Sequence, residues 1–237
     1  MRRALVVLMA AATVFLVAGP AFAAVPTNAK WRSSDPFGAW NNGGYILYNN
    51  EWNSSAGPQT IWADSFHHWG AESTQAAGNT AVETYPCVQK NFKNVPVRSF
   101  RLIRSGFTES MPANKSGLDA EAANDIWLNK NNIEVMIWVD NHGQKPAGGV
   151  IHQAVISGRP YDVYQGGAHV FSFVISGRPA PSGQVDLLSA LQWLIRHHFL
   201  AGSDVLTQVN FGWEIASTGD IPMNFTLTEY ALSTNVR

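Results

Sequence analysis

Apolar and polar residues alternate over much of this chain, which is the pattern of β-strands that bury one face. The clearest case is the segment 133–143, IEVMIWVDNHG. Its aliphatic residues share one face of the strand: Ile133, Val135, Ile137 and Val139. Glu134, Met136 and Trp138 share the other. Because an isolated charge among apolar groups is costly, we expect Glu134 to face an aromatic-lined cleft and not the core.

A second strand, predicted over 205–217, has the same design. Its sequence VLTQVNFGWEIAS places an apolar set on one face, namely Val209, Phe211, Trp213 and Ile215, and Glu214 on the other. Two strands far apart in the sequence therefore each carry a lone glutamate on an exposed face. Two carboxyl groups that face one groove are what glycoside hydrolysis requires.

The remaining pattern predicts an all-β domain with one packed α-helix. Further strands are expected within 44–52, 60–70, 78–92, 95–104, 170–175 and 224–232. The helix is predicted over 184–200, where Leu187, Leu191 and Leu194 recur at helical spacing and Asp186 suits the N-terminal end of the helix dipole. We expect the apolar stripe of this helix to pack on the outside of a sheet.

The first 23 residues have the features of a secretory signal peptide. Arg2 and Arg3 precede an apolar run over 4–17, and the segment ends in Ala21-Phe22-Ala23. This run is shorter than the roughly 20 residues that span a bilayer, so no membrane anchor is expected. The sequence predicts cleavage near Ala23, secretion, and a single domain over 24–237.

Composition narrows the classes of ligand. The chain has 16 Lys and Arg against 17 Asp and Glu, and only 14% of its residues are charged, which argues against nucleic-acid and membrane partners. Its nine Trp suit stacking on sugar rings, although Trp also fills cores. Cys87 is the single cysteine, so no intramolecular disulfide can form, and we expect it to be buried and inert. The pairs His67-His68 and His197-His198 lack metal-ligand spacing, so no metal or cofactor is predicted.

Four segments together resemble glycoside hydrolase family 12, the small secreted endo-β-1,4-glucanases and xyloglucanases. They are YNNEW (48–52), NDIW (124–127), EVMIW (134–138) and FGWEIASTG (211–219), in the order in which the family has them. The resemblance covers essentially the whole mature chain. It implies a β-jelly-roll sandwich of two antiparallel sheets with a concave substrate groove, and a monomer whose partner is a β-glucan polysaccharide.

The resemblance also implies roles for individual residues. Glu134 matches the nucleophile of a retaining mechanism, Glu214 the general acid/base, and Asp125 an auxiliary aspartate that hydrogen-bonds the nucleophile. The residues that match sugar contacts or line the groove are Asn50, Trp52, Met136, Trp138 and Pro146. We expect burial and like charge to raise the pKa of Glu214, while hydrogen bonds keep Glu134 ionised.

Several alternatives remain at this point. A non-catalytic glucan-binding jelly roll would use the same Trp residues without cutting the polymer, and a xylanase of the related jelly-roll clan would also use two glutamates. A serine hydrolase is disfavoured because no G-x-S-x-G motif occurs. The sequence does not separate cellulose-like glucan from xyloglucan or mixed-linkage glucan. Asn53 stands where many family members have Gly, so the turn after Trp52 could differ.

Overall fold

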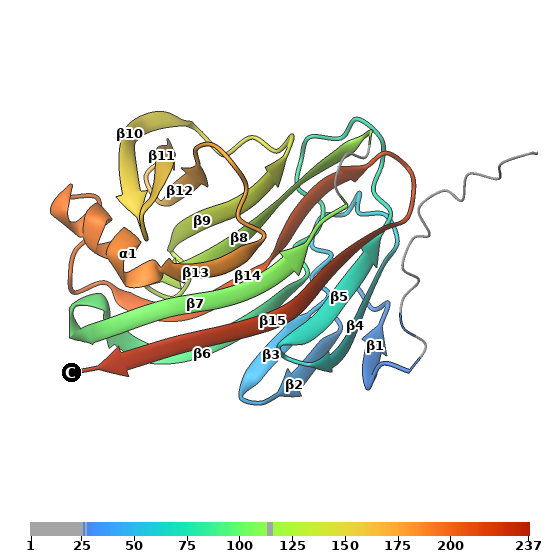
Figure 1. Cartoon of the computed structure of the whole chain (residues 1–237), viewed down its shortest axis with the longest axis horizontal. Helices are drawn as coiled ribbons and strands as arrows, with labels where there is room; N and C mark the ends of the chain where they lie inside the picture. Colours follow the sequence, from blue (N-terminus) through green and yellow to red (C-terminus); the bar gives the residue numbers. More distant parts are fainter. Residues whose placement is uncertain (1–25, 27, 113–115) are drawn as a thin grey trace, which may run out of the picture.

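The alternating segments form two β-sheets that pack face to face, as the computed structural model of the chain shows (Figure 1). The structure describes residues 26, 28–112 and 116–237. The predicted signal peptide, residues 1–23, lies outside the described residues. Within these ranges, the predicted all-β architecture with one α-helix is confirmed.

Six strands make up the smaller sheet. In spatial order they are β1 (Trp31–Ser33), β4 (Gln59–Ser65), β5 (His68–Ser73), β15 (Met223–Val236), β7 (Phe100–Ser110) and β13 (Ser182–Asp186). Where the pattern predicted one strand over 60–70, a turn at Phe66 and His67 separates β4 from β5. A 3₁₀ turn, η1 (Val97–Ser99), precedes β7.

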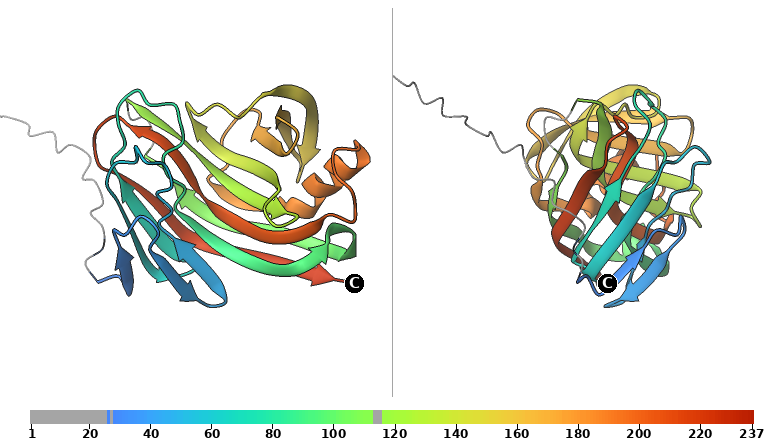
Figure 2. Two further views of the ribbon diagram at one scale, coloured as in Figure 1. Left: turned by 180° about the vertical axis from the view of Figure 1, so that it is seen from behind. Right: turned by 90° about the vertical axis from the view of Figure 1, so that its right-hand side faces the viewer.

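Nine strands make up the larger sheet, which carries the predicted site. In spatial order they are β10 (Gly149–Ile156), β11 (Arg159–Gly166), β12 (Val170–Ile175), β9 (Ile133–His142), β8 (Leu118–Leu128), β14 (Val205–Thr218), β6 (Cys87–Pro96), β3 (Tyr45–Tyr48) and β2 (Ala39–Asn42). Figure 2 shows the two layers from two further sides. Neighbouring strands of the described residues are antiparallel except β9 and β12, which are parallel, so the predicted purely antiparallel sheets need this one correction.

The core lies between the sheets, and the strand faces that fill it are those predicted from the alternation. On β9, Val135, Ile137 and Val139 are buried in this core, and on β14 Phe211 and Trp213 are buried with them. Glu134 and Glu214 therefore project from the opposite face of the larger sheet, away from the smaller one.

The helix α1 (Leu187–Arg196) is shorter than the predicted 184–200. Residues 184–186 belong to β13, where they pair with β7, and the Asp186 carboxylate caps the helix by accepting from the backbone N–H of Ser189 at 3.1 Å. His198, with φ of 64°, lies beyond the helical end. The apolar side chains of α1, including Trp193 beside Phe173 of β12, belong to the same core as the sheets, so the helix closes the interior and does not lie outside it.

No helix within the described ranges has the length and apolar character needed to cross a membrane.

Candidate active site

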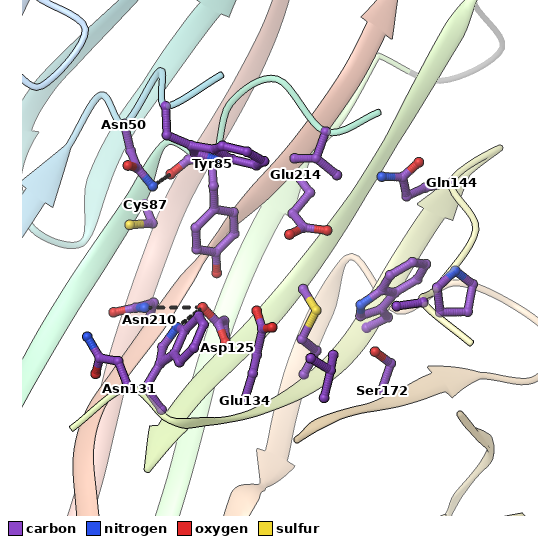
Figure 3. A pocket seen from close by; sticks show the side chains of 18 of the residues that line it. Asn50, Tyr85, Cys87, Asp125, Asn131, Glu134, Gln144, Ser172, Asn210 and Glu214 are labelled. Atoms are coloured by element: carbon purple, nitrogen blue, oxygen red, sulfur yellow. Dashed lines mark hydrogen bonds between the residues drawn. The ribbon is translucent and has the colours of Figure 1, made fainter. Parts of the chain in front are cut away.

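A cleft of about 870 Å³ runs over the outward face of the larger sheet (Figure 3). The structure places all eight sequence-predicted site residues along it: Asn50, Trp52, Asp125, Glu134, Met136, Trp138, Pro146 and Glu214. They come from four separate parts of the chain. The outward face of the sheet thus gathers the carboxyl groups and the aromatic side chains at one place.

Glu134 and Glu214 enter the cleft from two strands that have β8 between them. Glu134 on β9 lies opposite Trp127 of β8, and Glu214 on β14 lies opposite Glu121 of β8. Burial raises the pKa of Glu134 to about 7. Burial, and then the charge of Glu134, raise the pKa of Glu214 to about 8. Glu134 is therefore the first of the two to ionise, which is the order that a nucleophile and an acid need.

One expectation about Glu134 is wrong. Hydrogen bonds were expected to keep it ionised at low pH, but burial dominates and raises its pKa. Asp125, the expected donor, uses its Oδ2 atom as an acceptor for the indole Nε1–H of Trp127 at 2.6 Å and the amide of Asn210 at 3.3 Å. Its Oδ1 atom is buried without a hydrogen-bond partner. Burial, and then the charge of Glu134, raise the pKa of Asp125 well above its usual range.

Sequence reasoning missed a fourth carboxyl group in this cluster, that of Glu121. Its side chain is 0% exposed, and no described side chain donates a hydrogen bond to its carboxyl group. Burial raises its pKa well above the usual range, and the charges of Glu214, Asp125 and Glu134 act in the same direction. The sequence alone could have placed Glu121 near Asp125, because residues four positions apart on a strand share one face.

Gly212 allows the strand that carries Glu214 to approach its neighbour closely. A Cβ atom at this position would lie 2.1 Å from the carbonyl oxygen of Pro86 and 2.9 Å from Cys87. Both contacts are shorter than real Cβ contacts, so any side chain here would push β14 away from β6. The glycine of the FGWEIASTG segment thereby fixes the position of Glu214 two residues later.

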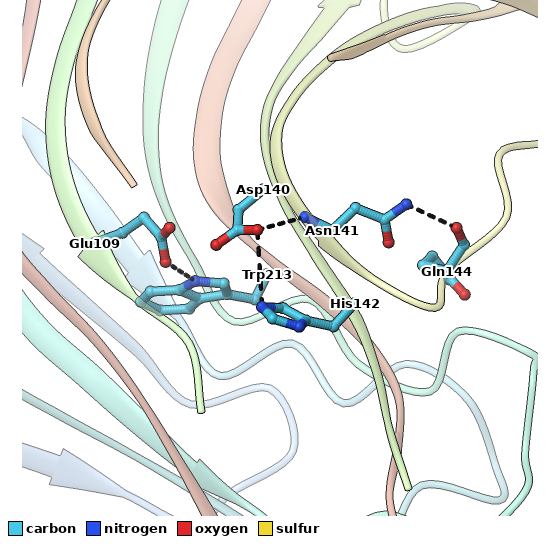
Figure 4. Close-up of polar contacts among 6 residues, drawn as sticks. All are labelled: Glu109, Asp140, Asn141, His142, Gln144 and Trp213. Atoms are coloured by element: carbon cyan, nitrogen blue, oxygen red, sulfur yellow. Dashed lines mark hydrogen bonds and ion pairs between the residues drawn. The ribbon is translucent and has the colours of Figure 1, made fainter. Parts of the chain in front are cut away.

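Trp213 anchors the other face of the same strand (Figure 4). Its indole Nε1–H donates to Oε2 of Glu109 on β7 at 3.1 Å, across the interior between the sheets. Burial raises the pKa of Glu109 to about 8, the Trp213 hydrogen bond opposes this shift, and the charge of Asp140 adds to it. Glu109 was not singled out from the sequence, because a lone Glu in the strand 100–110 carries no signal of what lies across the core.

Asp140 in turn supports the loop that follows β9 (Figure 4). Its Oδ1 atom accepts from the backbone N–H of Asn141 at 2.7 Å and lies 3.7 Å from Nε2 of His142. The Asn141 amide donates to the backbone carbonyl of Gln144 at 2.9 Å. Gln144 and Pro146 of this loop both line the cleft, so the loop forms one of its walls.

The predicted sugar contacts differ in how they meet the cleft. Trp52 is 52% exposed and offers its ring to the cleft, whereas Trp138 is 1% exposed and lies beneath the surface beside Met136. Asn50 has a φ of 49°, and its amide donates to the backbone carbonyl of Tyr85 at 3.2 Å. The resulting turn carries Trp52 to the rim.

Other lining residues were not predicted. They are polar or aromatic and include Tyr48, Gln89, Trp127, Ser172 and Asn210. Ser172 and Asn210 occupy outward positions of predicted strands, but a single polar residue in a strand does not identify a site. Within the described ranges, no group of three or more His, Cys, Asp or Glu side chains is arranged to hold a metal ion.

Known proteins are similar to this chain over most of its length. The sequence model of Glycosyl hydrolase family 12 matches residues 43–235. A probable xyloglucan-specific endo-β-1,4-glucanase A of Neosartorya fischeri is 24% identical over 230 residues, which cover 89% of this chain and 94% of the relative. The protein of the same name from Aspergillus terreus is 27% identical over 222 residues, 85% of this chain and 86% of the relative.

Solved structures share the fold. The xyloglucanase domain of NopAA from Sinorhizobium fredii, in complex with cellobiose, superposes with a TM-score of 0.80 at 24% identity and covers 87% of this chain and 100% of that domain. The catalytic domain of Humicola grisea Cel12A with a soaked thio cellotetraose gives 0.79 at 20% identity, over 86% of this chain and 99% of that one. Because the family model spans most of the sequence, the chain belongs to glycosyl hydrolase family 12 and is a hydrolase of glycosidic bonds.

Proposed function

We propose that this chain is an endo-β-1,4-glucanase that cleaves cellulose-like glucans with retention of configuration. The observation that carries the proposal is a pair of glutamates, Glu134 and Glu214, that face one open cleft with the pKa of Glu214 above that of Glu134. This is the arrangement in which one carboxyl group attacks while the other still holds a proton.

In the first step the carboxylate of Glu134 forms a bond to the anomeric carbon of the sugar. The glycosidic C–O bond breaks, and the departing oxygen takes the proton of Glu214. In the second step Glu214, now a carboxylate, removes a proton from water. The resulting hydroxyl oxygen bonds to the anomeric carbon and releases Glu134. Two inversions give net retention, and a carboxyl separation of about 5–5.5 Å is expected for this outcome.

Aromatic and polar side chains along the cleft bind the glucan on either side of this centre. Trp52 would stack on a sugar ring beside Asn50, while Met136 and Trp138 line the floor next to Glu134 and Pro146 shapes the rim. No residue of this set needs a cofactor or a metal ion for the two steps.

Xyloglucan is the second candidate substrate. It is favoured by the names of the relatives, since both fungal proteins are called xyloglucan-specific and the NopAA domain is called a xyloglucanase. Initial rates on carboxymethylcellulose, mixed-linkage glucan and xyloglucan, with product sizes, separate these substrates. A fall in viscosity that precedes the release of small sugars identifies endo cleavage.

The proposal includes export and a monomeric state. Residues 1–23 would be removed after Ala23, leaving 24–237 as one secreted catalytic domain. Mass spectrometry of the secreted protein gives the cleavage site, and light scattering gives its mass in solution. A retained N-terminus or a dimer would contradict this part.

Glu134→Gln tests the catalytic assignment. The substitution removes the nucleophile and almost no volume, so turnover should fall by at least three orders of magnitude while binding of cello-oligosaccharides persists. Glu229→Gln is a matched control, because Glu229 is exposed on β15 of the other sheet. If Glu134→Gln retained near-normal activity, or if the native protein bound β-glucans and released no reducing ends from any, the proposal would be wrong.

A further inference from the structure

Trp127 touches the catalytic cluster at two points. It lies on β8 directly opposite Glu134 of β9, and its ring lines the cleft. Its indole Nε1–H donates to Oδ2 of Asp125 at 2.6 Å, a short hydrogen bond between side chains two residues apart on one strand face. The ring faces the substrate space while its N–H is turned toward an acid.

Asn210 approaches the same oxygen from the other side. It lies opposite Asp125 on β14, and its amide Nδ2 is 3.3 Å from Oδ2. Oδ2 thus faces two N–H donors, whereas Oδ1 is buried and has no hydrogen-bond partner. The two oxygens of Asp125 are chemically inequivalent, because an oxygen that accepts two N–H groups has its lone pairs in use.

We infer that Trp127 is a positioning residue for the nucleophile: with Asn210, its indole N–H fixes Asp125 so that the carboxyl proton sits on Oδ1 and is donated to Glu134. The inference deepens the proposed function and rests on the assignment of Glu134 as nucleophile. Trp127 acts on the nucleophile through Asp125. Toward the sugar, its ring only forms part of the cleft wall.

The surroundings of Asp125 favour a protonated acid. The titratable groups that face it are Glu134 on β9, Glu214 on β14, Glu121 on β8, Cys87 at the start of β6, and Tyr85 two residues before β6. None of them is a cation, and burial and the charge of Glu134 raise the pKa of Asp125 well above its usual range. A neutral Asp125 that donates to Glu134 stabilises the ionised nucleophile, which no other described side chain does.

Trp127→Phe separates the two roles of the side chain, because it keeps a flat aromatic wall and removes the N–H. We expect kcat to fall roughly three- to tenfold, KM to change less than about twofold, and the acidic limb of the kcat/KM profile to move to higher pH. Trp40→Phe is the matched control, since Trp40 stacks on Trp31 away from the cleft. If Trp127 served only as part of the cleft wall, the pH profile of kcat/KM for Trp127→Phe would superpose on that of the native protein.

A second measurement does not depend on turnover. In the infrared difference spectrum between native protein and Asp125→Asn at neutral pH, the native protein should show the C=O band of a protonated carboxylic acid, and Trp127→Phe should shift that band. Absence of the band would overturn the inference. Failure here while Glu134→Gln remains inactive would refute the role of Trp127 and leave the nucleophile assignment standing, whereas an active Glu134→Gln would remove the basis of both.

Discussion

Glu109 makes the stability of the fold depend on pH, and Glu109→Gln should remove its contribution to that dependence. Its carboxyl group is 5% exposed and lies between the sheets, with Trp213 as its hydrogen-bond donor. Burial raises its pKa from 4.5 to about 8. An acid that binds its proton more tightly when folded stabilises the fold below pH 4.5, and this contribution is lost as the pH rises through 8.

The size of the effect follows from the two pKa values. At about 1.36 kcal/mol for each tenfold change in proton affinity, the full loss is about 5 kcal/mol, of which about 2.5 kcal/mol falls between pH 5 and pH 7. Gln has the same shape and no charge to lose, and its amide oxygen can still accept from the Trp213 indole.

Guanidinium chloride unfolding measures this directly, with the fluorescence of the nine Trp residues as signal. The free energy of unfolding of Glu109→Gln, minus that of the native protein, should rise by about 2.5 kcal/mol from pH 5 to pH 7. Asp140 titrates in both proteins, so it largely cancels in this difference. The exposed Glu229→Gln provides the control. A difference between Glu109→Gln and native protein that stays constant over this range would refute the reasoning.

Two further predictions concern the cleft. In Glu214→Ala, azide should restore cleavage of an activated aryl glycoside and give the β-glycosyl azide. An activated leaving group needs no proton from an acid, and the azide anion can reach the glycosyl-enzyme in place of water. An α-glycosyl azide, or no rescue, would contradict retention through Glu134. In Trp52→Ala, KM for cello-oligosaccharides should rise roughly tenfold with a much smaller change in kcat, since covering about 60 Å² of the indole contributes about 1.5 kcal/mol; an unchanged KM would place the sugar elsewhere.

The strand faces were predictable because they depend on a local period. Alternation alone separated Val135 and Ile137 from Glu134 on β9, and Phe211 from Glu214 on β14, and the structure has each on the predicted side. The start of the helix was not predictable in this way. Residues 184–186 fit a helical pattern, but their backbone pairs with β7, a partner about 80 positions earlier that no local window contains.

Contacts between strands decided the rest of the site. Which residue lies across from Asp125 depends on the register of β8 with β14, and that register places Asn210 there. Glu121 could be assigned to the correct face, but its position opposite Glu214 required the same register. The partners of Asp125 depended on the same kind of contact, because Oδ2 accepts from Trp127 on its own strand and from Asn210 on the neighbouring one.

Four carboxyl groups in one cluster raise the question of how their charges are limited. Glu121 and Asp125 are the most deeply buried, and burial raises the pKa of each well above its usual range, which favours the protonated form of both. Glu214 comes next, since the charge of Glu134 adds to its burial, and Glu134 is the first to ionise. Near neutral pH the cluster therefore carries its negative charge mainly on Glu134. That is the protonation state in which one carboxylate can attack the sugar while its partner still has a proton to give.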